Sequence, residues 1–173
     1  MSRESPVADK PRPIGKDATG YEVITKAMRE LLNQFPGLYE DEVVRFEQIE
    51  NDGDIGFSND SGALVYAEKK DVLGYINQTC QYPFFLVYRT NTTKETGKLS
   101  AFDFVDTFGK WLCSEPVTIG DTDYKLAEFP QLDGGRKIIR ITRDNAYGQD
   151  PKEDGTQDWI VPVTVQYTNK FKL

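Results

Sequence analysis

The sequence predicts an α+β domain, a mostly antiparallel β-sheet with two α-helices packed on one face. Two segments show the three-and-four apolar spacing of amphipathic helices, and a proline follows each of them. The other apolar residues form short runs, often alternating with polar ones, between Gly, Asn and Asp turns, as in antiparallel strands. A chain of 173 residues is long enough for one domain of this kind.

The first helix is predicted after Thr19, its expected N-cap, with an apolar face from Tyr21 to Phe35 and an end at Pro36-Gly37. Ser100 is the expected N-cap of the second helix, whose buried face continues to Leu112. Before the first helix, residues 1–17 contain three prolines and little to bury. We therefore expect a flexible N-terminal arm at 1–17 and a single domain at 18–173.

The strands are predicted from period-two patterning and turn residues. Tyr82–Arg89 is nearly continuous in apolar and aromatic residues, which is typical of a central strand. The expected strands are 42–49, 62–68, 72–76, 82–89, 117–128, 136–143 and 159–167. The most aromatic strand and helix faces should pack together, which pairs Phe84, Leu86 and Tyr88 with Phe104, Phe108 and Trp111.

The residues give little support for catalysis. The chain has no histidine, and it contains no nucleophile elbow, phosphate loop or dinucleotide motif. Asp52, Asp54 and Asp60 have the spacing of a solvated turn rather than of a calcium loop. Cys80 and Cys113 are expected to be free thiols in a reducing compartment. We expect no catalytic residue, metal or cofactor, although a carboxylate-pair enzyme stays open as an alternative.

Charge argues against a protein that grips nucleic acid, because the formal net charge is −7 and no long Lys/Arg run opposes it. Phe84, Phe85 and Tyr88 fit core packing better than base stacking for the same reason. An acidic surface would suit a channel through which DNA passes without sticking. No apolar run reaches the ~20 residues that cross a bilayer, so no membrane contact is expected.

The polar stretch 144–158 is longer than a hairpin needs, which favours a binding or assembly role. Deleting it is expected to leave the fold intact. Its acidic residues are the candidate assembly contacts: Asp144, Asp150, Glu153, Asp154 and Asp158.

The order of several short motifs resembles the tail terminator (minor capsid, head–tail joining) proteins of Gram-positive phages, prophages and phage-tail-like bacteriocins. The similarity covers about 20–173, and no single motif is a signature. The matching segments, in order, are Gly62-Ala63-Leu64-Val65, Tyr75-Ile76, Gln81 to Arg89, Phe104-Val105-Asp106, Trp111-Leu112 and Val165-Gln166-Tyr167 to Phe171.

The resemblance implies a structural virion protein that forms a homohexameric ring, caps the tail tube and ends its polymerisation. Its implied partners are its own copies, the tail tube protein, a sheath protein and a head–tail connector or collar. The implied location is the tail end of a virion or tail-like particle, assembled in the bacterial cytoplasm. The alternatives are a connector or adaptor module that acts without a ring, and the carboxylate enzyme.

Overall fold

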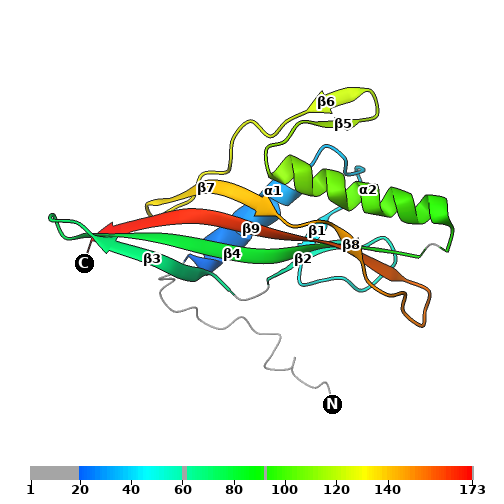
Figure 1. Cartoon of the computed structure of the whole chain (residues 1–173), viewed down its shortest axis with the longest axis horizontal. Coiled ribbons are helices and arrows are strands. Elements are labelled where there is room, and N and C mark those ends of the chain that lie inside the picture. Colours follow the sequence, from blue (N-terminus) through cyan, green and yellow to red (C-terminus); the bar gives the residue numbers. More distant parts are fainter. Residues whose placement is uncertain (1–19, 60–61, 92, 173) are drawn as a thin grey trace, which may run out of the picture.

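The computed structural model describes residues 20–59, 62–91 and 93–172. The arm predicted at 1–17 and the cap predicted at Thr19 lie outside the described residues. The described chain confirms the α+β class, with two helices and a mostly antiparallel sheet (Figure 1). The elements in chain order are α1 Tyr21–Leu32, β1 Val44–Phe46, β2 Ile55–Asn59, β3 Leu64–Lys70, β4 Tyr75–Thr90, α2 Glu95–Leu112, β5 Val117–Ile119, β6 Thr122–Tyr124, β7 Arg136–Arg143, β8 Tyr147–Gly148 and β9 Gln157–Lys172.

The centre of the sheet is one long antiparallel pair, β4 with β9, each of 16 residues. The main path of the sheet runs β1-β2-β4-β9-β7, while β3 joins β4 and β8 joins β9. The first half of β4 pairs with β3 and its second half with β2. We call the end at Tyr75 and Lys172 the hairpin end, and the end at Thr90 and Gln157 the loop end.

Both helices cover the same face of this sheet, which we call the core face; the other face is the open face. The hydroxyl of Thr25 on α1 lies 2.9 Å from the hydroxyl of Tyr82 on β4. The ring of Phe104 on α2 lies 4.9 Å from that of Tyr88. Since alternate residues of a strand share a face, Tyr82 and Tyr88 lie on one side of β4. The prediction that two helices pack on one face is confirmed.

The core is aromatic where the two helices meet. Phe35, just beyond α1, stacks on Phe108 of α2 with ring centroids 4.1 Å apart. Trp111 is buried beside Phe35 at 5.4 Å. The predicted contact between Tyr88 and α2 is therefore confirmed. The ring of Phe84 contacts Phe57 of β2 at 5.6 Å and Tyr82 of its own strand at 6.0 Å, and it shares the core cluster with Phe108 and Trp111.

Several predicted boundaries are wrong for local reasons. The segment 72–76 is not a separate strand, because the Asp71 carboxylate accepts the N–H groups of Leu73 and Tyr75 and folds a turn. β4 begins only after that turn and continues to Thr90. The strand predicted at 42–49 is limited to Val44–Phe46, since Glu47 takes a left-handed φ of 55°.

The start of the second helix was also placed wrongly, because α2 begins at Glu95 and its N-cap is Lys94 rather than Ser100. Gly97 resembles a turn residue in sequence, but a glycine in a first turn weakens a helix only modestly. The strand predicted at 117–128 is the short hairpin β5–β6, in which Gly120 has a φ of +61°. β9 extends beyond both ends of the strand predicted at 159–167.

β2 was missed entirely. Its Ile55-Gly56-Phe57 segment contains a glycine where the side chain of Ile49 crosses the strand, so that a Cβ on Gly56 would lie 2.7 Å from Ile49 Cγ1. In sequence such a glycine indicates an interruption. In the fold it permits a close crossing.

Candidate functional site

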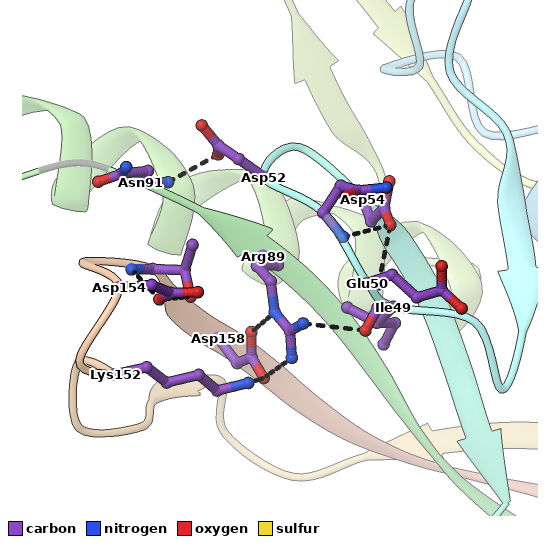
Figure 2. Close-up of polar contacts among 11 residues, drawn as sticks. Ile49, Glu50, Asp52, Asp54, Arg89, Asn91, Lys152, Asp154 and Asp158 are labelled. Carbon is purple, nitrogen blue, oxygen red and sulfur yellow. Dashed lines mark hydrogen bonds and ion pairs between the residues drawn. The ribbon is translucent and has the colours of Figure 1, made fainter.

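The predicted assembly loop 144–158 is anchored by an ion pair between Arg89 of β4 and Asp158 of β9 (Figure 2). These residues are directly opposite each other in the β4–β9 ladder. Arg89 Nε lies 2.7 Å from Asp158 Oδ1 and Nη2 lies 3.0 Å from Oδ2, a bidentate geometry. The side chains are only 15% and 10% exposed. Asp158 therefore anchors the loop through a largely buried ion pair, and its role as an assembly contact stays a prediction.

The same arginine ties a second loop to the first. Its Nη1 donates to the carbonyl of Ile49 at 2.9 Å, and Lys152 Nζ lies 3.2 Å from Asp158 Oδ2. The loop before β2 and the loop before β9 are thus held against the open face at the loop end. Figure 2 shows both loops converging on the guanidinium group.

Hydrogen bonds lower the pKa of three carboxyl groups in this region, those of Asp54, Asp154 and Asp158. Burial alone would raise the pKa of Asp158, but its bonds to Arg89 and Lys152 outweigh burial, so the pKa lies below its ordinary value. The pKa of Asp54 is lowered mainly by the N–H of Asn51, with help from Glu50. The pKa of Asp154 is lowered by hydrogen bonds from the hydroxyl and N–H of Thr156.

The stretch 144–158 is therefore an ordered part of the sheet rather than a free loop. Tyr147 and Gly148 form β8 against β9, and Lys152 and Thr156 share a backbone hydrogen bond of 2.8 Å. Deleting the stretch would remove the ion-pair partner of Arg89. That the fold stays intact after such a deletion remains a prediction. Of the predicted contacts, Asp144, Asp150 and Glu153 are exposed, whereas Asp154 is exposed but bonded to Thr156.

A hollow of about 340 Å³, lined by residues between 39 and 55, bears on the alternative of a carboxylate enzyme. Its acidic lining residues are Asp41, Glu42, Asp52 and Asp54. Glu42 accepts the N–H of Tyr39, Asp52 that of Asn91, and Asp54 those of Glu50 and Asn51. A general acid of a carboxylate pair needs a raised pKa, and that of Asp54 is lowered. Within the described ranges, no group of three or more His, Cys, Asp or Glu side chains could hold a metal ion.

The sequence did not predict which strands form the edges of the sheet. One of the described edges is closed by a side chain, and two are open. At the loop end, the Asn33 side chain closes the edge of β1: its Nδ2 donates to the Val44 carbonyl at 3.0 Å and its Oδ1 accepts the Val44 N–H at 2.8 Å. At the hairpin end the edges are β3 and β7. All 7 residues of β3 are exposed, so neither face of that strand is covered.

Each hairpin-end edge strand contains one irregularity. The register shifts between Val65 and Ala67 in β3 and between Ile138 and Arg140 in β7. The residues at the shifts, Tyr66 and Ile139, are exposed hydrophobic side chains, 52% and 48%. Bulges of this kind increase the local twist of an edge and leave one residue out of the ladder. Each bulge thus places one exposed apolar side chain on an open edge of the sheet.

Comparison with models of known protein families and with curated protein sequences finds no match to this chain. No described helix is long and apolar enough to span a bilayer.

Proposed function

We propose that this protein is a structural, non-catalytic subunit that closes with its own copies into a ring at the end of a phage or phage-like tail tube. The motif order of the sequence supports the tail terminator assignment. The observation that carries the ring is the pair of open edges, β3 and β7, on opposite sides of the hairpin end.

Strand direction makes these two edges compatible. β3 is antiparallel to β4, β4 to β9, and β9 to β7, so β3 and β7 run in opposite directions. Two copies set side by side in the same orientation therefore bring β3 of one next to β7 of the other as an antiparallel pair. The strands are of similar length, 7 and 8 residues. No flip of either copy is needed.

A contact of this kind is head-to-tail, because different surfaces of the two copies meet. Such contacts generate a ring when the rotation between copies closes, and a filament when it does not. The bulges at Tyr66 and Ile139 supply added twist at the joint. Six copies follow from the resemblance alone, since a ring on a six-fold tail must match its symmetry. The tube protein, a sheath protein and a head–tail connector are the proposed neighbours of the ring.

Disulfide trapping tests the joint directly. In a Cys113→Ser background, Ala67→Cys on β3 is combined with Lys137→Cys or Ile139→Cys on β7. Within one chain these strands are three strand spacings apart, roughly 14 Å, beyond the reach of a disulfide. Any bond between them is therefore intermolecular. We expect a ladder of covalent oligomers that ends at a closed species, with no ladder from either single-cysteine control.

Ile139→Pro is the matching loss-of-assembly variant, because residue 139 lies at the register shift of β7, and proline removes an N–H donor from the edge. Ile139→Thr keeps the donor and is the control. Light scattering should give monomers for the proline variant and rings for the control, with similar near-ultraviolet circular dichroism. A wild-type protein that stays monomeric on purified tail tubes would favour the adaptor alternative instead.

The function in the particle is tested by adding the protein to polymerising tail tubes. Wild-type rings should stop elongation at one end and narrow the distribution of tube lengths in electron micrographs. Ile139→Pro should leave tubes of uncontrolled length. Equal tube lengths with and without wild-type protein would remove the tail-end role even if rings form.

A further inference from the structure

The charges of this acidic protein are distributed unevenly along the β4–β9 ribbon. The loop end carries two acidic segments, 40–54 and 144–158. The open face of the hairpin end is basic instead. Its cationic residues come from three separate strands: Lys69, Lys137, Arg140, Lys170 and Lys172.

Register and alternation place these side chains on one face. Lys170 and Lys172 alternate with Asn169 and Phe171, and Asn169 is buried on the core face. Lys137 precedes the buried Ile138, and Arg140 precedes the buried Ile141. Lys69 pairs with Asn77, which follows the buried Ile76. Among the described residues of β3, β4, β7 and β9 near this end, no acidic residue lies on the open face. Glu68 pairs with Gln78, which is on the core face.

The cations recur at a regular spacing. Outward residues of a strand are about 6.7 Å apart, so the face is divided into rows across the sheet. Four successive rows each contain at least one cation. Starting from the hairpin end, the rows pair Lys172 with Tyr75, Lys170 with Asn77 and Lys69, Lys137 with Thr168, and Arg140 with Gln166. Among the described residues none of these cations forms an ion pair, whereas Lys26, Lys110 and Lys152 each do.

Local contacts hold these side chains on the face. The ammonium groups of Lys170 and Lys172 lie 4.8 and 5.5 Å from the centre of the Tyr75 ring. Arg140 Nε donates to Gln166 Oε1 at 2.6 Å, and the amide of Gln166 donates in turn to the hydroxyl of Tyr66. A polar row thus crosses the whole sheet from β7 to β3. The charges are presented on a rigid support.

We propose that this basic face binds the sugar–phosphate backbone of double-helical DNA without reading its sequence. Repeated cations with amide and hydroxyl donors between them are the groups that contact phosphates in protein–DNA complexes. The donors between the cations are Asn77, Thr79, Gln81, Gln166 and Thr168. An acidic protein surface, such as the loop end of a second copy, is the competing occupant. Protein interfaces have an apolar centre, whereas the apolar residues of these rows, Leu64 and Ala67, lie at the β3 edge.

The inference goes beyond the proposed ring and does not require it. A single copy exposes the face, and a ring joined through β3 and β7 would turn all of its open faces to the same side of the closed sheet. If that side is the lumen, DNA contacts the basic rows as it passes. The net charge of −7 does not describe this surface, because the acidic residues lie elsewhere.

Fluorescence anisotropy of a short labelled duplex, titrated with the full chain at several salt concentrations, tests the proposal. The double variant Lys137→Gln with Arg140→Gln removes two phosphate contacts. At about 0.1 M salt it should weaken binding roughly 60-fold and flatten the salt slope by about 2. Lys94→Gln with Lys125→Gln changes the net charge equally and lies off the face; it should bind within about two-fold of wild type.

Three outcomes would overturn the proposal: no duplex binding by wild type at low salt, an equal loss in both double variants, or a strong preference for one sequence. A salt-sensitive self-association that the face variant abolishes, without DNA binding, would assign the face to the loop end of a second copy. Melting temperatures of all variants check the fold. Disulfide trapping of β3 with β7 is scored separately, so failure of DNA binding and failure of the ring are distinguished.

Discussion

The two ends of the β4–β9 ribbon consist of the same pair of strands, yet they are covered in different ways. At the loop end, helices pack on the core face and two loops, pinned by Arg89 and Asp158, pack on the open face. At the hairpin end, β3 is exposed throughout and the turn residue Val72 is fully exposed. Strand pairing alone therefore does not cover both faces at an end of the ribbon. The loop end is covered on both faces within the chain, whereas at the hairpin end β3 is covered on neither face.

The largest expected difference between the ends is in stability. Phe108 is fully buried and stacks on Phe35, so Phe108→Ala should lower the free energy of unfolding by about 3–5 kcal/mol. Val72→Ser at the hairpin tip should change it by less than ~0.5 kcal/mol. Urea denaturation of the monomer measures both. Similar losses in the two variants would mean that the hairpin end has its own buried core.

A smaller loss is expected from the ion pair at the loop end. Arg89→Met keeps the length of the side chain but leaves Asp158 with little compensation, which should cost about 2–4 kcal/mol. The exposed pair of Lys26 with Glu22 is the matched control, and Lys26→Met should cost less than ~0.5 kcal/mol. A double-mutant cycle with Asp158→Asn isolates the coupling. A coupling no larger than that of the control pair would show that the loops are held by other contacts.

Acid should weaken the loop end selectively. The folded-state pKa of Asp158 is lowered, so the unfolded chain binds the proton more readily; this contribution to stability is present above about pH 4 and is lost as pH falls through the folded pKa. Asp158→Asn should therefore show a shallower loss of stability between about pH 5 and pH 2. Hydrogen exchange of the 149–156 amides reports the site. Parallel pH profiles for wild type and variant would contradict the assignment.

The smallest expected effect concerns the closed edge. Asn33→Ala removes the side chain that satisfies the Val44 N–H and carbonyl, at a cost of about 1–2 kcal/mol. The exposed β1 edge should then promote irregular association, visible as concentration-dependent light scattering. Gln34→Ala, on the next exposed residue, should not. Unchanged solution behaviour of Asn33→Ala would mean that α1 shields the edge without this amide.

Local patterning was enough to predict the fold class. The apolar face of α1, the aromatic face of α2 and the period-two runs determined an α+β domain with both helices on one face. Patterning failed to predict strands where the residue type indicated one local structure and the fold contains another. Gly56 suggests a break but permits the crossing of Ile49 over β2, and Asp71 folds a turn where a strand was expected. At both positions the deciding contacts are with residues only a few positions away, and the alternation of apolar and polar residues does not reveal them.

The candidate sites show the same division. The sequence by itself determined how many acids and bases the chain has, and it identified 144–158 as unusual. Only the tertiary structure decided that Asp158 faces Arg89, 69 positions away, and is removed from the surface. It also gathered Lys69, Lys137 and Lys170 from three strands into one basic face. The sequence gives only the total charge. Which charges share a surface depends on the strand register, because alternate residues of every paired strand point to opposite sides.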